Sequence, residues 1–191
     1  MLVGVALVTV LLFALFGVAL IVGIWLWVTY NSFVRRRVRV RNGYSGIDVQ
    51  LKRRYDLIPN LVETVKGYAA HEREVLEAVV RARQAGIDAE GAEEQMQAEN
   101  LITGTLRKLF ALSEAYPDLK ANQSFLELQE ALEETEDQIA AARRIYNSNV
   151  ADYNQGVQVF PGLLVAGWFG FEREPFFEME DSERAAPSAS L

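Results

Sequence analysis

Cysteine is absent from the 191 residues, and histidine occurs only once. The absence of cysteine excludes disulfides, thiolate metal sites, cysteine nucleophiles and a lipid attached through a thioether. The single histidine, His71, is followed by Glu72, but the zinc-protease helix motif needs a second histidine at position 75, which is valine. A di-iron bundle needs a Glu-x-x-His motif on each of two helices, which one histidine cannot provide. We therefore interpret His71 as a surface or boundary residue and expect no cofactor, no metal ion and no catalytic residue.

Charged residues are missing from positions 1–34 and are unevenly distributed after them. Residues 35–86 contain 12 Lys or Arg against 6 Asp or Glu, whereas residues 87–191 contain 7 against 20. The acidic second part argues against nucleic acid as a partner, because phosphate binding needs a clustered positive surface. The basic part directly follows the uncharged segment, where anionic lipid headgroups would attract it.

The uncharged segment is almost continuously apolar over residues 2–28. As a helix it would be roughly 40 Å long, against a hydrocarbon core of about 30 Å, so a tilted membrane span is expected. A cleaved signal peptide fits poorly, because there is no charged n-region and no small-x-small site follows. A buried core helix fits less well still, since no partner of matching hydrophobicity lies downstream. We predict a transmembrane anchor over residues 1–34, with its span and aromatic belt at Leu11, Leu20, Trp25, Trp27 and Tyr30.

Five arginines follow this segment, whereas the N-terminal side offers only its terminal amine. The positive-inside bias places the N-terminus outside and the remaining chain in the cytoplasm, in a single-pass protein of the cell (inner) membrane. The residues assigned to topology and headgroup contact are Arg35, Arg36, Arg37, Arg39 and Arg41.

After residue 34, apolar residues recur at heptad spacing in four blocks, over residues 40–55, 61–82, 98–116 and 125–153. Narrow stripes of this kind are typical of antiparallel bundles with coiled-coil-like contacts. No alternating strand pattern occurs beyond residue 34. We predict an all-α fold in which the transmembrane helix is followed by an antiparallel four-helix-bundle-type domain with long helices over residues 35–158.

Residues favouring helix ends separate the four blocks. The expected positions are a cap at Asp56 with Pro59 in the first turn of the second helix, a loop bracketed by Gly86 and Gly91, a turn at residues 116–118, and a cap at Asn122 or Ser124.

Four passes return the chain to the membrane, where residues 160–171 form a dozen apolar residues broken by three glycines. This segment is too short to span a bilayer. It either lies in the membrane interface or against the exit point of the anchor, or it wraps the bundle as ordinary core, and the sequence leaves these alternatives open. The assigned contact residues, in an apolar and membrane-proximal segment over 159–180, are Phe160, Leu163, Leu164, Trp168, Phe169 and Phe171. Residues 181–191 are expected to be a disordered tail.

Polar residues crowd the segment 48–60, which predicts either a helix-to-helix corner with exposed ion pairs or a site that docks a partner. The candidate contact residues are Asp48, Arg53, Arg54 and Asp56. The acidic run containing Glu133, Glu134 and Glu136 is interpreted as a solvated helix face, with a divalent-cation patch as the alternative. Asparagines near tyrosines, at Asn31, Asn147 and Asn154, are interpreted as buried residues that set helix register.

Several runs of residues resemble the LemA family of bacterial membrane proteins. They are SGIDVQLKRRYDLIPNLV at 45–62, TVKGY at 64–68, AYPDLKAN at 115–122, RRIYN at 143–147 and FFE at 176–178, and the resemblance covers about residues 30–180. Tyr44 stands where the family usually has tryptophan, and Tyr55 where histidine is common. The resemblance implies an N-terminal anchor and an antiparallel helical cytoplasmic domain. It implies little about activity, because the family has no established enzymatic role. Some relatives accompany membrane-bound proteases or organelle-forming membrane systems.

The leading hypothesis is a non-enzymatic, membrane-tethered scaffold or adaptor that forms a homo-oligomer and contacts the bilayer and other membrane proteins, such as a membrane protease. The alternative is a signal transducer that couples the bilayer to the bundle through a helix continuous with the anchor. An enzyme using the carboxylates of Glu133, Glu134 and Glu136 remains a third hypothesis, and it would require a metal-dependent activity.

Overall fold

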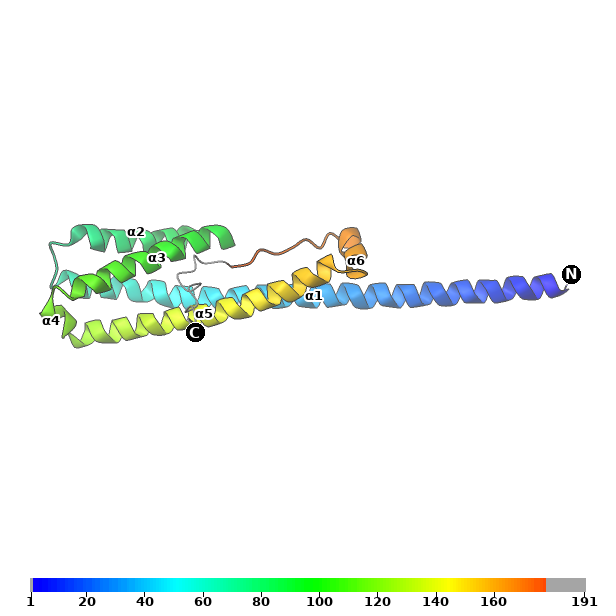
Figure 1. Cartoon of the computed structure of the whole chain (residues 1–191), viewed down its shortest axis with the longest axis horizontal. Coiled ribbons are helices and arrows are strands. Elements are labelled where there is room, and N and C mark those ends of the chain that lie inside the picture. The colour runs from blue at the N-terminus through cyan, green and yellow to red at the C-terminus, as the bar shows by residue number, and fades with distance from the viewer. Residues whose placement is uncertain (1, 178–191) are drawn as a thin grey trace, which may run out of the picture. The chain divides into compact units, whose positions relative to one another are not determined.

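The computed structural model describes residues 2–177, with side chains from Thr9 onward (Figure 1). These residues form six helices and no strand, so the predicted all-α fold is confirmed for the described part of the chain. Contacts divide them into two compact units. Unit 1 contains the residues up to 42 together with 148–174, and unit 2 contains 43–147 together with the residues from 175.

Helix α1 runs without interruption from Leu2 to Lys66. The predicted break at Asp56 is therefore wrong: this residue is exposed inside α1, and Pro59 lies more than a turn before its end. A proline inside a helix leaves the carbonyl four residues earlier without its usual donor. Here that carbonyl belongs to Tyr55, and the Nε of Arg83 donates to it at 2.7 Å. A tertiary hydrogen bond thus replaces the one that Pro59 removes, and the helix continues.

Unit 2 is the four-helix bundle. Its helices are the second part of α1, α2 (Arg73–Asp88), α3 (Ala92–Ser113) and the first part of α5 (Gln123–Gln158), with the single turn α4 (Pro117–Lys120) between α3 and α5. Short connections reverse the chain direction at each end, as expected for an antiparallel bundle. Gly91 adopts a φ of 87° between α2 and α3, whereas Gly86, expected in that loop, lies inside α2. Asn122 caps α5, because its Oδ1 accepts a hydrogen bond from the Phe125 amide at 3.0 Å.

The core of unit 2 follows the predicted stripes, with one change. The block at 61–82 is divided between two helices: Leu61 and Val65 lie on α1, and Val79 and Ala82 lie on α2. The other blocks each contribute buried residues from one helix: Ile47, Leu51 and Tyr55 on α1, Ala98, Ile102 and Leu109 on α3, and Phe125, Leu132, Ile139 and Tyr146 on α5. Four passes remain because the corner moves to residues 67–72 rather than disappearing.

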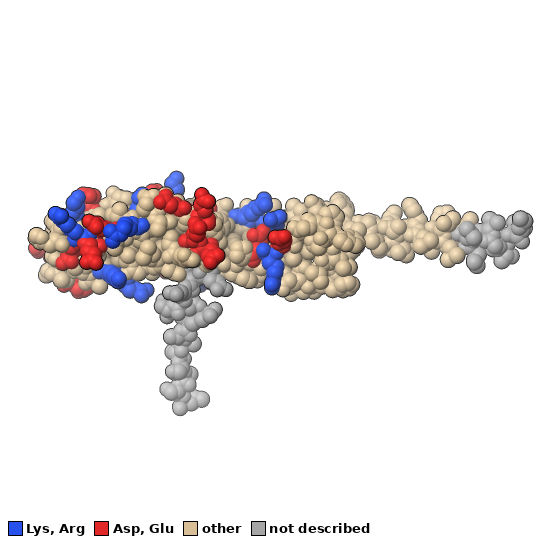
Figure 2. All heavy atoms as spheres, turned by 90° about the horizontal axis from the view of Figure 1, so that it is seen from above, with Lys and Arg blue, Asp and Glu red and all other residues tan. Residues whose placement is uncertain are grey.

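Unit 1 contains the first part of α1, the end of α5 and helix α6 (Gly162–Phe169). Its small core is built from Phe33, Val40, Val150, Tyr153, Val157 and Val165. By length and composition, α1 is the one helix among the described residues that is apolar enough to cross a membrane. Residues 9–24 are exposed apart from the half-buried Gly17, and Figure 2 shows no charged residue on this stretch.

Candidate functional site

The candidate site is a collar in unit 1, defined as residues 30–41 of α1, 149–158 of α5, α6, and the segment 170–174. Aromatic rings hold it together directly after the apolar stretch. The ring of Tyr30 lies 5.0 Å from that of Phe169 and 5.5 Å from that of Phe171, and the ring of Phe33 lies 5.2 Å from that of Phe171. The predicted belt residue Tyr30 and the predicted contact residues Phe169 and Phe171 therefore meet at one place.

Two glycines allow the backbone segments of the collar to approach each other. A Cβ at Gly162 would lie 2.5 Å from the carbonyl oxygen of Gly156 and 3.1 Å from the Phe33 ring. A Cβ at Gly156 would lie 2.9 Å from the same ring. Gly170 ends α6 in the left-handed conformation, with a φ of 69°, which suits a residue without a side chain. Because the obstacle at Gly162 is a backbone oxygen, the turn from α5 into α6 can approach α1 this closely only with glycine at that position.

At least three of the five arginines assigned to headgroups are engaged by carboxylates of the collar. Arg36 and Arg39 both bind Asp152, at 3.0 and 2.9 Å, and Arg37 binds Glu174 at 3.1 Å. Arg36 also donates to the Asp152 carbonyl at 2.7 Å. Partly exposed pairs of this kind contribute only about 0–1 kcal/mol each. Their main effect is to set the positions of α1, α5 and the segment after α6.

Helix α6 buries one face and exposes the other. Val165 and Ala166 are buried. Of the six assigned contact residues, Phe171 is half-buried and the other five are exposed. Their exposed fractions are 74% for Phe160, 52% for Leu163, 46% for Leu164, 71% for Trp168 and 54% for Phe169. The segment thus packs beside the end of the apolar stretch rather than serving entirely as core, and it leaves a large apolar surface uncovered.

Asparagine side chains bind the extended segment that follows α6. In unit 1, the amide of Asn154 pairs with the backbone of Glu174, at 2.8 and 2.9 Å. In unit 2, the amide of Asn147 pairs with the backbone of Phe177 in the same way, at 3.0 and 2.8 Å. These asparagines were interpreted as setting register between helices, but they bind a non-helical segment instead. Asn31 donates to a carbonyl of its own helix, that of Trp27.

A polar network lies inside unit 2. Glu99 of α3 is fully buried and accepts hydrogen bonds from Tyr55, from Gln95 at 3.3 Å and from Arg54 at 3.1 Å. Arg54 is also buried, and it bonds Thr103 at 3.0 Å and pairs with Glu136 at 2.9 Å. Burial raises the pKa of Glu99, while the hydrogen bond from Tyr55 and the charge of Arg54 partly oppose this effect. The same burial, together with the charge of Glu99, raises the pKa of the Tyr55 hydroxyl.

The network changes the interpretation of the polar segment 48–60. Arg54 is enclosed by α3 and α5 side chains, so it is unavailable to a partner, whereas Asp48, Arg53 and Asp56 are exposed. Arg53 pairs with Glu134 at 2.7 Å. Two carboxylates of the acidic run are thus held by arginines, and no group of three ligating residues that could hold a metal ion occurs among the described residues. His71 is exposed.

Glu99 and Gln95 were not identified from the sequence, although a signal was present. Positions 95, 98, 102, 105 and 109 continue one heptad stripe, so Gln95 lies on the apolar face of α3 with Glu99 one turn further. Arg54 similarly lies between the buried Leu51 and Ile58. Polar residues inside an apolar stripe indicate a buried network, because an unpaired charge there would be costly.

Comparison with known proteins matches residues 43–190 to the LemA family. The chain is 28% identical to Protein LemA of Metamycoplasma hominis over 158 residues, which cover 81% of this chain and 71% of that protein. It is 25% identical to Magnetosome protein MamQ 2 of Paramagnetospirillum magneticum over 175 residues, and 25% identical to Magnetosome protein MamQ of Magnetospirillum gryphiswaldense over 174. Each magnetosome relative covers 78% of this chain, which spans 64% of their length. With its long apolar N-terminal helix, the chain is a membrane-associated protein, and it belongs to the LemA family.

Proposed function

We propose that the protein is a membrane-tethered, non-enzymatic helical scaffold or adaptor that acts as an oligomer at the cytoplasmic face of the cell membrane. One observation carries the tether: the most hydrophobic stretch of α1 contains no buried residue. Apolar surface of this extent is unfavourable in water, and a bilayer is the environment that accommodates a helix apolar on all sides.

The rest of the described chain supports a binding role. Unit 2 is a bundle whose buried polar side chains bond to one another or to backbone carbonyls of their own helices, so they stabilise the fold rather than face a substrate. Its surface carries isolated large apolar residues, among them Val49, with 64% exposed, and Ile145, with 61%. Such residues are candidate contacts for a second copy or for another membrane protein.

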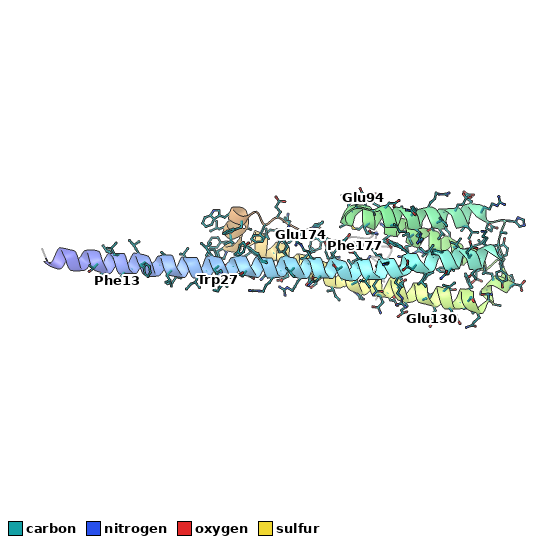
Figure 3. All side chains as sticks on the ribbon, turned by 180° about the vertical axis from the view of Figure 1, so that it is seen from behind. Phe13, Trp27, Glu94, Glu130, Glu174 and Phe177 are labelled. Atoms are coloured by element: carbon teal, nitrogen blue, oxygen red, sulfur yellow. The ribbon has the colours of Figure 1, made fainter. Side chains whose placement is uncertain are left out.

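Site-specific photo-crosslinking in the full-length chain tests the proposal. A photoreactive residue at Val49 or Ile145 should give covalent self-adducts, or adducts with membrane proteins, in intact cells. The matched control is the same residue at Glu130, which is exposed and polar on α5 (Figure 3). A chain that stays monomeric by mass in lipid nanodiscs, and gives no more adduct at the apolar positions than at Glu130, would contradict the scaffold.

The alternative function is signal transduction, and it is supported by the continuity of α1 from Leu2 to Lys66. Each residue inserted into a helix rotates the following part by about 100°. Inserting two residues after Val28, which precedes the collar, should abolish function in a transducer, whereas a passive tether should tolerate the change. Insertion of seven residues, which nearly restores the rotation, is the control.

A further inference from the structure

Helix α6 is apolar over its whole length. No charged residue occurs between Val159 and Phe171, and the buried face of α6 uses only Val165 and Ala166. Of the remaining large side chains in residues 160–169, Phe160 and Trp168 are more than two-thirds exposed, and the other three are 46–54% exposed. A soluble surface has no reason to gather these residues in one short segment, so a covering environment is needed.

The position of α6 within unit 1 identifies that environment. The ring of Phe169 lies 5.0 Å from the ring of Tyr30, which follows the apolar stretch of α1 by two residues. Figure 3 shows Trp27 on α1 at the level of α6. The exposed apolar surface of α6 is therefore continuous with the end of the surface that the bilayer covers.

The depth of the bilayer follows from the same residues. Trp25, Trp27 and Tyr30 are the side chains that favour the boundary between hydrocarbon and headgroups. A bilayer placed with this boundary at residues 25–30 reaches α6. With eight residues, α6 is roughly 12 Å long, which is too short to cross the hydrocarbon but enough to lie in the interface.

We propose that α6 is a second membrane contact, which lies in the interface of the same bilayer that the N-terminal helix spans, with Phe160, Leu163, Leu164 and Trp168 turned toward the lipid. The proposal rests on the proposed tether and adds a second point of attachment. The occupant of the α6 surface is lipid rather than protein, because the surface continues the lipid-facing surface of α1. The two contacts together would hold the collar at a fixed height and tilt relative to the bilayer.

The three tryptophans of the chain provide the test, since two lie on α1 and one on α6. In the full-length variant Trp25→Phe/Trp27→Phe, the fluorescence of Trp168 reports α6 alone. In nanodiscs of phosphatidylcholine and phosphatidylglycerol, both faces of the bilayer are open to iodide, which quenches tryptophan in water. The same nanodiscs can be prepared with brominated acyl chains, which quench tryptophan in the bilayer. We expect Trp168 emission to be blue-shifted, to lose most of its intensity in brominated lipid, and to resist quenching by iodide.

Two other outcomes would overturn the proposal. Quenching by iodide without quenching by bromine would place Trp168 in water. Protection from both would mean that protein covers α6, from a second copy or a partner. As a solvent control, Arg107→Trp, combined with phenylalanine at all three native tryptophans, should be quenched by iodide and unaffected by bromine, because Arg107 is exposed on α3.

The variant Trp168→Phe separates failure of this inference from failure of the proposed function. It keeps Trp25 and Trp27, whose quenching by bromine tests the span itself. If these residues are not quenched, the tether is wrong; if only Trp168 is unquenched, the second contact alone is wrong. A polarity-sensitive dye on Leu163→Cys, in a chain that keeps all its tryptophans, independently reports whether α6 lies in water or in the bilayer. The dye attaches at this position alone, because the natural chain has no cysteine.

Discussion

The carboxylate of Glu99 accepts hydrogen bonds from Tyr55, Gln95 and Arg54 in the interior of unit 2. Gln95 also donates to the Tyr55 hydroxyl at 2.7 Å. Removing its two oxygens takes away the acceptor of the Tyr55 hydroxyl and of Nη1 of Arg54, whereas Gln95 keeps the Tyr55 hydroxyl and the Gly86 carbonyl as acceptors. The net contribution of a buried ion pair is often small, but the cost of leaving its partners unsatisfied is not.

We expect Glu99→Leu to lower the free energy of unfolding by about 2 kcal/mol or more at neutral pH, since each unsatisfied buried group costs about 1–3 kcal/mol. Glu99→Gln should cost clearly less, because it keeps one acceptor oxygen and Arg54 keeps Glu136. Denaturant unfolding of the detergent-solubilised chain, followed by circular dichroism, measures both. A leucine variant as stable as the glutamine variant would show that the network contributes little.

The pKa of Glu99 gives a prediction for pH. Burial raises this pKa above the value of about 4.3 expected in an unfolded chain. At a pH between the pKa of Glu99 in the unfolded chain and its pKa in the folded protein, the folded protein holds a proton that the unfolded chain has released. The contribution of Glu99 to stability is therefore present below about pH 4.3 and is lost as the pH rises through the folded pKa. The stability of the natural chain relative to Glu99→Gln should therefore decrease from acidic to neutral pH. Parallel stability curves for the two proteins would contradict the raised pKa.

At the scale of elements, the collar depends on how closely the α5–α6 turn approaches α1. A side chain at position 162 would place its Cβ against a backbone oxygen, which cannot rotate away. A Cβ added at Gly167, on the same helix, would have no atom within 4 Å. The two glycines therefore form a matched pair with opposite expectations. One is required by packing, and the other is open to substitution.

We expect Gly162→Ala to release α6 from the collar and Gly167→Ala to leave it in place, with a gain of about 0.5–1 kcal/mol from helix propensity. The measurement is maleimide labelling of Val165→Cys, placed on the buried face of α6 in a chain without other cysteines. Labelling should become faster with Gly162→Ala only. Equal labelling rates in both backgrounds would show that the close approach is not needed.

At the scale of the whole molecule, the proposed topology makes the bundle cytoplasmic. The single-cysteine variant Glu130→Cys, on exposed α5, should react with a membrane-impermeant maleimide only after the cells are permeabilised, because the arginines after the apolar stretch hold this side inside. Leu2→Cys should react in intact cells. Labelling of Glu130→Cys in intact cells would contradict the proposed orientation and place the bundle outside the cytoplasm.

Much of the fold was predictable because helical periodicity is a local property. The heptad stripe of α5 predicted most of its buried residues and that of α3 predicted half, and the apolar stretch of α1 was evident from composition alone. The corner at Asp56 was predicted wrongly because the bond that keeps α1 continuous comes from Arg83, 24 residues beyond Pro59. A partner that distant in sequence leaves no local pattern.

The sequence by itself determined the helical class, the apolar N-terminal stretch and the basic segment that follows it, since each depends on neighbouring residues. Only the tertiary structure decided which side chains those segments meet. It brought Phe169 and Phe171 to Tyr30, gave Arg36 and Arg39 a shared carboxylate in Asp152, and enclosed Glu99 with Arg54. The residues in these contacts lie 45 to 141 positions apart in the sequence. Helix packing, rather than any local sequence pattern, determines which of them meet.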